Sequence, residues 1–294
     1  MPELGTLRIG TCSWKYDSWR GLVYSDETIK NRDYLTAYSR IFDTVEIDQW
    51  FWSLFETDQV VLPDPKTVKH YAASVPDNFR FTIKMPNSLT LTHFYRKNPS
   101  DELETNPHFL SPDLLKTTLH HLEPFGTKIG ALLYQFEYLN KHKMPSQSDF
   151  QRRFQTFAEH LPPNLIHAVE IRNPNYLNRR FFDWLRELNL TPVLLHGYYM
   201  PNIVETYRKI YPSLAGNVVI RLHGPDRSGI ENESGGDWSR VLRPKDDELE
   251  TIVKMIQHLR QNRVNVFLNI NNHYEGSAPI TIKKIRELLA HLPG

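Results

Sequence analysis

The chain has 294 residues, of which 40% are hydrophobic and 23% charged, as in an ordinary globular protein. Its 35 lysines and arginines balance 34 aspartates and glutamates, which weighs against strong non-specific nucleic-acid binding but leaves a local basic groove open. The single cysteine, Cys12, excludes an internal disulfide and a cysteine-based structural zinc site. The sequence has neither a run of about 18 apolar residues nor a secretory signal, so we expect a cytoplasmic protein that has no membrane partner.

Hydrophobic periodicity predicts strands and helices that alternate along the whole chain. The strands are expected at residues 7–12, 44–48, 79–84, 129–136, 167–172, 192–196, 218–223 and in the first part of 264–279. The helices are expected around residues 35–42, 65–74, 113–122, 149–160, 181–188, 202–211, 246–261 and 282–292.

Eight strands alternating with eight helices predict an α/β fold, a single-domain TIM-type (β/α)8 barrel over residues 1–294. An open doubly wound sheet would more often carry a glycine-rich phosphate fingerprint after the first strand, and Gly10-Thr-Cys-Ser-Trp14 is not one. Residues 85–111 are interpreted as a long loop or lid, because so long a connection in a compact domain is more often functional or mobile than idle.

A polar layer is predicted at the carboxyl ends of the strands. If the apolar faces of the strands meet the helices, the alternate positions point into the barrel, at the end where barrel enzymes carry their sites. These inward positions hold Glu46, Asp48, Lys84, Gln135, Glu170, Arg172, Arg221, His223, Asn269 and Asn271. The mixture of charges and amides favours a functional pocket, and the alternative is a structural salt-bridge layer that closes the barrel mouth.

The last strand runs into a turn that suits an anion or a polar ligand. The residues that follow the strand are Asn272, His273 and Tyr274. Gly276 permits a sharp turn, Ser277 can cap the last helix and Pro279 suits its first turn. A helix N-terminus of this kind can bind an anion, although an ordinary strand-to-helix connection has the same pattern.

Stretches along nearly the whole chain resemble the YecE-like family, also called the domain-of-unknown-function 72 family. They are Ile9-Gly-Thr-Cys-Ser-Trp with Trp19-Arg20-Gly21, Thr44-Val45-Glu46-Ile47, Phe79-Arg80-Phe81 with Lys84, Ala168-Val169-Glu170-Ile171-Arg172, Arg221-Leu222-His223-Gly224, and Asn271-Asn272 with Gly276-Ser277-Ala278-Pro279. The resemblance implies a single-domain barrel similar to those of endonuclease IV and xylose isomerase. It supplies no function, and nucleic acid enters as a partner by fold analogy alone.

The chain departs from the family's commoner Glu-Ile-Asn-Ser-Thr-Phe-Tyr run after the second strand. It has Glu46-Ile47-Asp48-Gln49-Trp50-Phe51-Trp52 instead. Any role of an amide at position 48 therefore falls to a carboxylate here, which changes the cation or substrate that this position prefers.

Glu46 and Glu170 are the candidate acid/base pair across the barrel, and His223 is a third candidate catalytic residue. The two glutamates can instead be metal ligands together with Asp48 and His223. No His-x-His or His-Glu-x-x-His pattern occurs, so no cofactor and no permanent zinc cluster are predicted, while a weakly bound magnesium or manganese ion stays open. Cys12 is interpreted as a core residue, because no activating base is identifiable.

Lys84, Arg172 and Arg221 suit a phosphate or carboxylate group, or else each neutralises one of the glutamates. Aromatic residues near the strand ends are candidates for a stacking rim over a sugar or base, or for packing under long loops. These are Trp14, Tyr16, Trp19, Trp50, Trp52 and Tyr274.

Three functional hypotheses follow. The first is an enzyme that hydrolyses or isomerises a small anionic ligand, phosphorylated sugar- or nucleotide-like, with Asn271, His273 and the Gly276–Ser277 turn positioning it. The second is a nucleic-acid binding or processing protein. The third is a ligand-binding protein without catalysis.

Overall fold

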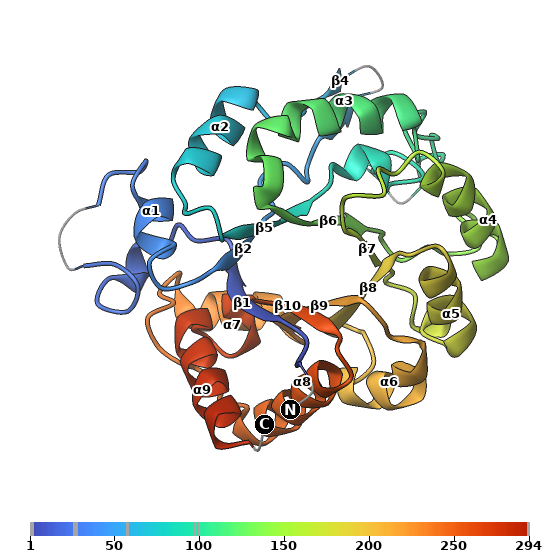
Figure 1. Cartoon of the computed structure of the whole chain (residues 1–294). Coiled ribbons are helices and arrows are strands. Elements are labelled where there is room, and N and C mark those ends of the chain that lie inside the picture. The colour runs from blue at the N-terminus through green and yellow to red at the C-terminus, as the bar shows by residue number, and fades with distance from the viewer. Residues whose placement is uncertain (1–2, 26–28, 57–58, 97, 99, 293–294) are drawn as a thin grey trace.

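The computed structural model describes residues 3–25, 29–56, 59–96, 98 and 100–292. Eight parallel strands close into a barrel in the order β1-β2-β5-β6-β7-β8-β9-β10, with β10 paired to β1, and helices surround the ring (Figure 1). The barrel strands are β1 (Leu7–Cys12), β2 (Thr44–Ile47), β5 (Arg80–Lys84), β6 (Ile129–Gln135), β7 (His167–Glu170), β8 (Thr191–Gly197), β9 (Asn217–Gly224) and β10 (Asn265–Ile270). The predicted TIM-type (β/α)8 barrel is confirmed.

The helices follow the strands as the apolar periodicity predicts. They are α1 (Tyr34–Tyr38), α2 (Pro65–Ala73), α3 (Pro112–Leu122), α4 (Gln147–Ala158), α5 (Arg179–Glu187), α6 (Ile203–Ile210), α7 (Arg227–Ser234), α8 (Asp246–Gln261) and α9 (Ala278–His291). Caps fix several of their starts: the Asp64 carboxylate accepts hydrogen bonds from the amides of Lys66 and Thr67, and the Ser111 hydroxyl accepts one from Leu114. Within the described residues no helix is long and apolar enough to cross a membrane.

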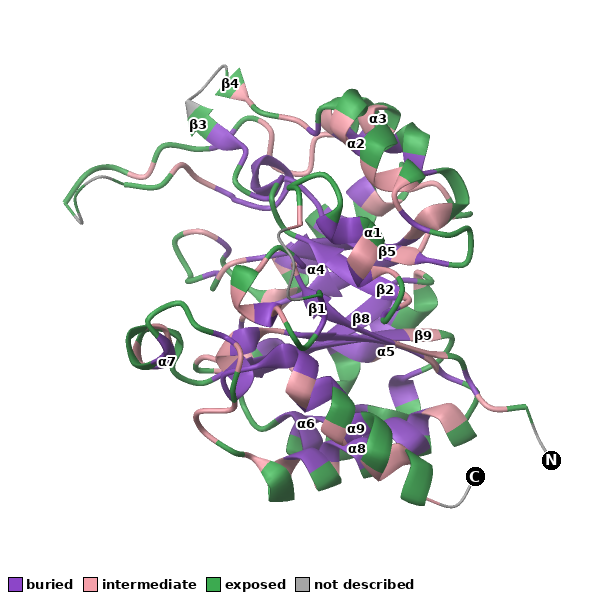
Figure 2. Cartoon of the chain, turned by 90° about the vertical axis from the view of Figure 1, so that its left-hand side faces the viewer, coloured by how far each residue is buried: buried purple, intermediate pink, exposed green. Residues whose placement is uncertain are grey.

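The barrel interior has two parts. A small apolar core fills its amino-terminal half, formed by Ala131, Leu133, Ala168, Val193, Val219 and Phe267. The larger core lies between the strands and the helices, so the strands are buried on both sides while the helices keep an exposed outer face (Figure 2). The polar layer lies above the small core, at the strands' carboxyl ends.

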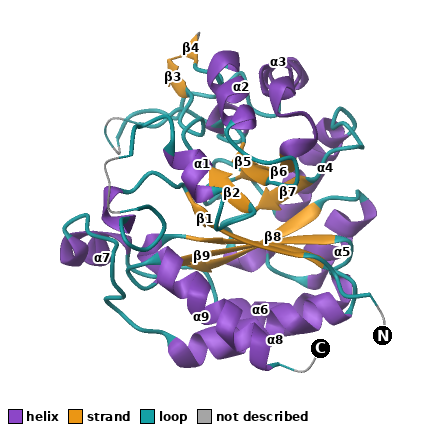
Figure 3. Cartoon of the chain, turned by 60° about the vertical axis from the view of Figure 1, so that its left-hand side comes forward, coloured by secondary structure: helices purple, strands orange, loops and turns teal. Residues whose placement is uncertain are grey.

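Three features of the chain differ from the sequence-based prediction. A short antiparallel pair, β3 (Leu54–Glu56) with β4 (Gln59–Val60), lies between β2 and α2. Helix α7 follows β9 and is set apart from α6, α8 and α9 (Figure 3). Strands β2 and β7 end one and two residues earlier than predicted, which puts Asp48 and Arg172 in the loops that follow them.

The described part of the 85–111 segment is a long loop with one 3-10 turn, Asn87–Leu89. Its first residues, 85–92, are buried, and the Asn87 side chain accepts hydrogen bonds from the backbone amides of Ser53 and Leu54. His93 then bridges to Thr105, so that the chain doubles back on itself. The start of this segment is therefore anchored to the β2–β3 connection, and its role as a lid stays a prediction.

Candidate functional site

Arg221, near the end of β9, is the centre of a buried ion network. Its Nε and one terminal nitrogen donate to the two oxygens of Glu46 at 2.7 and 2.6 Å. The other terminal nitrogen donates to Glu170 and, at 3.2 Å, to Gln135 Oε1. Arg172 Nε donates to the second oxygen of Glu170 at 2.8 Å. Of the charged residues predicted to face inward, Glu46, Glu170, Arg172 and Arg221 thus form one network, which Lys84 does not join, and both glutamates are buried.

This network holds Glu170 ionised. Burial by itself would raise the pKa of Glu170, but Arg221 and Arg172 outweigh burial and lower that pKa to about 2. Burial likewise acts to lower the pKa of Arg221, and Glu170 with Glu46 raises it well above the ordinary value instead. A carboxylate that stays ionised between two arginines does not donate a proton near neutral pH, so the geometry favours a fixed charge over a proton-donating role for Glu170.

A cavity of about 420 Å³ opens above the network at the carboxyl ends of the strands. This volume is in the range of small-molecule sites. Among the residues singled out from the sequence, those that line it are Tyr16, Asp48, Trp52, Lys84, Gln135, Arg172, Arg221, His223, Asn271 and His273. The two glutamates lie beneath this lining and act on the cavity through Arg221 and Arg172.

The cationic side chains of the cavity differ in the hydrogen bonds and ion pairs that they already make within the protein. Arg227 donates through its Nε to Glu231 at 2.9 Å and Arg172 through its Nε to Glu170, so the terminal nitrogens of both make no hydrogen bond within the described residues. Lys84 is only 8% exposed, and its ammonium makes neither a hydrogen bond nor an ion pair in the described part of the chain. Its Nζ lies 3.8 Å from the centroid of the Phe51 ring. Lys84 and the terminal nitrogens of Arg172 are therefore the more buried of the cationic donors that have no hydrogen bond here, since the Arg172 side chain is 20% exposed and that of Arg227 is 59% exposed.

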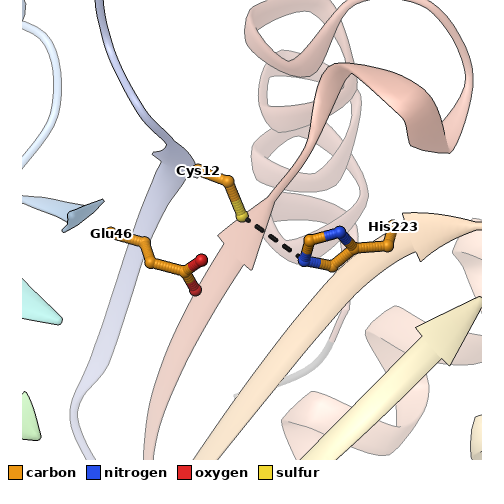
Figure 4. A group of neighbouring side chains, drawn as sticks. All are labelled: Cys12, Glu46 and His223. Atoms are coloured by element: carbon orange, nitrogen blue, oxygen red, sulfur yellow. Dashed lines mark hydrogen bonds between the residues drawn. The ribbon is translucent and has the colours of Figure 1, made fainter. Parts of the chain in front are cut away.

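Cys12, Glu46 and His223 form a second buried group at the floor of the cavity. They come from β1, β2 and β9, and Figure 4 shows the three side chains converging. Cys12 Sγ lies 3.7 Å from His223 Nε2, and the other ring nitrogen of His223 hydrogen-bonds with the Tyr198 hydroxyl at 3.2 Å. Burial, with Glu46 second, raises the pKa of the Cys12 thiol well above its ordinary value, whereas burial and Arg221 lower the pKa of His223. At neutral pH the pair is thus a thiol beside a neutral imidazole, not a nucleophilic thiolate.

The same three residues could hold a metal ion, because one ligand atom from each lies within 4.8 Å of the others. A thiol, an imidazole and a carboxylate suit zinc better than the magnesium or manganese expected from the sequence. Both oxygens of Glu46 already accept hydrogen bonds from Arg221, so an ion would compete with a guanidinium for this ligand. Cys12, Glu46 and His223 are therefore a candidate site for the weakly bound divalent metal, and binding of a metal there stays a prediction.

Several of the predicted binding residues lie outside the cavity. Trp14 is buried and packs edge-on against Tyr71, with ring centroids 5.1 Å apart. Trp19 and Trp50 are also buried in the helix-side core. Asn269 is fully buried and lies next to Arg221 in the β9–β10 register. These three tryptophans lie in the connections after β1 and β2 and pack into the core, as in the packing alternative considered for the aromatic residues.

The turn after β10 is closed rather than open to a ligand. Tyr274 donates to Glu248 Oε1 at 2.7 Å on the outside of the barrel. Asn272 Oδ1 accepts the hydrogen bond from the Ala278 amide, so Asn272, and not the Ser277 hydroxyl, caps α9. Gly276 has φ +115°, and a Cβ there would lie 2.6 Å from the Leu242 nitrogen. The segment around Leu242 thus covers the predicted anion site, and of that turn's candidates only His273 reaches the cavity, with Asn271 before it.

Other lining residues were not singled out from the sequence as ligand-binding. They are Cys12, Phe51, Leu91, Tyr95, Glu137, Tyr198, Arg227, Glu231 and Trp238. Two of them, Arg227 and Glu231, belong to α7. The signal for this helix was present: Asp226 Oδ1 accepts a hydrogen bond from the Gly229 amide at its start, and Gly235 adopts φ +56° at its end. Cys12 is the last residue of β1, and the remaining six lie in loops, which bring them to the cavity only through the tertiary fold.

Comparison with known proteins agrees with this architecture. Over residues 8–293 the chain matches the family described as "Protein of unknown function DUF72". It is 24% identical to the UPF0759 protein YunF of Bacillus subtilis (strain 168), over 96% of this chain and 94% of YunF. Crystal structures of two DUF72 family proteins have the same fold. TM1631 from Thermotoga maritima MSB8 has a TM-score of 0.68 and 20% identity, and the match covers 97% of this chain and 100% of TM1631. EF0366 from Enterococcus faecalis V583 has a TM-score of 0.68 and 17% identity, and the match covers 98% of this chain and 97% of EF0366. The chain therefore belongs to the DUF72 family.

Proposed function

We propose that this protein binds a small anionic ligand, bearing a phosphate or carboxylate group, in the cavity at the carboxyl ends of the barrel strands. The observation that carries the proposal is Lys84, a buried ammonium that lines the cavity and has no carboxylate partner among the described residues. Burying an unpaired charge costs free energy, and an anionic ligand would supply the missing partner.

Arg172 supports the same reading. Its Nε is held by Glu170, which fixes the guanidinium plane, and its carbon Cζ lies 5.0 Å from the centroid of the Tyr198 ring. A guanidinium oriented in this way can present its remaining donors to a phosphate or carboxylate as a fork. Gln135 and Asn271 add neutral polar groups to the lining, suited to the hydroxyls of a sugar-like ligand.

The proposal is tested by calorimetric titration with inorganic phosphate, ribose 5-phosphate and free ribose. We expect ribose 5-phosphate to bind and free ribose to bind at least about tenfold more weakly, a difference of about 1.4 kcal/mol. Lys84→Met and Arg172→Met should each remove most of this preference, whereas Lys254→Met, an exposed lysine of α8 that pairs with Glu250, should leave it unchanged. Equal binding of ribose and ribose 5-phosphate, or unchanged binding in both cavity variants, would contradict the proposal.

Nucleic acid is the second candidate ligand, and two exposed aromatic pairs favour it. Trp52 and Tyr95 line the cavity with ring centroids 5.9 Å apart, and Tyr138 and Tyr199 form an edge-to-face pair at 6.3 Å. Exposed aromatic rings of this kind can stack on bases or sugars. Binding of a single-stranded oligonucleotide that weakens steeply with salt would favour this candidate, since phosphate contacts release counterions. Absence of binding at low salt would exclude it.

A further inference from the structure

Lys84 differs from the other cationic side chains of the cavity in its surroundings. Arg172, Arg221 and Arg227 each make an ion pair with a glutamate. Lys84 is the last residue of β5, and its amine lies against the face of Phe51 instead of against a carboxylate. The carboxyl end of a barrel strand is where barrel enzymes place their reacting side chains.

These surroundings increase the share of the uncharged amine, although the ammonium stays the major form at pH 7.5. Burial, with Arg221 second, lowers the pKa of Lys84 to about 8, and the carboxylates of Glu46, Glu170 and Asp48 offset only part of this effect. Cys12 on β1 and His223 on β9 also line this part of the cavity, and burial keeps both uncharged near neutral pH. At pH 7.5 roughly a quarter of such a lysine carries a free electron pair, compared with about a thousandth of an ordinary one. A desolvated lysine beside another cation is the environment in which lysine acts as a nucleophile.

We propose that Lys84 forms a Schiff base with an aldehyde or ketone group of the ligand. The inference rests on the proposed function, because the anionic group of the same ligand would be held by Arg172 while its carbonyl carbon meets Lys84. The protein would then be an enzyme or sensor for a small anionic carbonyl compound. Glu46 and Glu170 would act by fixing Arg221 beside the amine, and would not themselves transfer protons.

The step balances without any further reactant. The Lys84 nitrogen forms a bond to the carbonyl carbon, and the carbonyl oxygen leaves as water. That oxygen takes one proton from the amine and one from solvent, so the product is a protonated imine. Asp48, in the loop directly after β2, lines the cavity, and within the described residues its carboxylate makes no hydrogen bond. It is placed to relay the proton between solvent and the departing oxygen.

Pyridoxal 5′-phosphate is a suitable probe, because it carries both an aldehyde and a phosphate. The protein is incubated with less than one equivalent of the probe, reduced with borohydride and mapped by peptide mass spectrometry. We expect Lys84 to be labelled at least tenfold faster than the exposed Lys254, and inorganic phosphate to slow labelling of Lys84 alone. Lys84→Arg, which keeps the charge but removes the amine, should still bind the probe and lose the adduct; Lys84→Met serves if the arginine variant does not fold.

The outcomes separate this inference from the proposed function. Saturable binding of the probe that Lys84→Met weakens, with no reduced adduct at Lys84, overturns the Schiff base and leaves anion binding standing. Labelling of Lys84 no faster than that of Lys254 also overturns the Schiff base. A failure of both the probe and inorganic phosphate to bind overturns the two proposals together. Fast labelling of Lys84 that phosphate slows supports both.

Discussion

Arg221 and Lys84 are two buried cations at the same end of the barrel, and they are held in opposite ways. Arg221 is 1% exposed and donates to Glu46, Glu170 and Gln135, so its charge is met within the protein. Lys84 is 8% exposed and lines the cavity, with its Nζ 3.8 Å from the centroid of the Phe51 ring. Both side chains are buried but only one is paired, so burial of a charge does not by itself identify a functional residue. A buried charged group is a candidate for ligand binding when the protein supplies no oppositely charged partner for it.

The largest expected effect comes from removing the satisfied cation. Arg221→Met should lower the free energy of unfolding by roughly 3–5 kcal/mol, because it leaves Glu46 and Glu170 buried without their shared partner. Urea denaturation followed by circular dichroism measures this loss. A variant within about 1 kcal/mol of the wild type would mean that the network contributes little, and the contrast with Lys84 would disappear.

Acid should weaken the network next. Glu170 has its pKa lowered to about 2, so its stabilising contribution is fully present above the ordinary carboxylate pKa and is lost as the pH falls from about 5 towards 2. At about 1.4 kcal/mol per pKa unit, this contribution is roughly 3 kcal/mol at neutral pH. The difference in unfolding free energy between the wild type and Glu170→Gln should therefore shrink as the pH is lowered. Glu250→Gln, at an exposed pair with Lys254, is the control and should show almost no such change.

Removing Lys84 should affect ligand affinity more than the free energy of unfolding, the reverse of what we expect for Arg221. Lys84→Met is expected to leave the unfolding free energy within about 1 kcal/mol of the wild type or to raise it, since it removes a buried charge that has no partner. Over the same comparison, affinity for ribose 5-phosphate should fall at least about tenfold. Denaturation and calorimetry on one preparation check both. A large loss of stability would indicate that Lys84 serves the fold instead of a ligand.

The smallest expected effect is that of zinc. With Arg221 holding both oxygens of Glu46, we expect zinc at roughly 100 µM to stabilise the wild type by less than about 1 kcal/mol in a thermal shift assay. Cys12→Ser should make no further difference. A shift of several degrees that Cys12→Ser abolishes would show that Cys12, Glu46 and His223 bind metal, and that Arg221 gives up Glu46 to the ion.

Much of the barrel could be predicted because its pattern is local. Alternation along each strand fixes which residues face inward, and this alone puts Glu46, Glu170, Arg221 and Lys84 in one layer. The same local reasoning does not show what surrounds the turn at Gly276 and Ser277. That turn contains every feature of an open helix N-terminus, yet the segment around Leu242, more than thirty residues away in the chain, covers it. A covering segment of this kind leaves no mark on the sequence of the turn.

The closed barrel and the end that carries the polar layer follow from the amino-acid sequence, because periodicity and strand order act along the chain, and the sequence motifs indicate the family. The ion pairs within that layer, between Arg221 or Arg172 and the two glutamates, are visible only in the three-dimensional structure. Whether a glutamate meets an arginine or a ligand depends on short distances between atoms of different strands, and these arise when the barrel closes. For the same reason the loops that carry Phe51, Tyr95 and Tyr198, and the helix that carries Arg227, joined the cavity only in three dimensions. The structure pairs the carboxylates of Glu46 and Glu170 with Arg221, and it leaves Lys84 at the cavity without a carboxylate partner among the described residues.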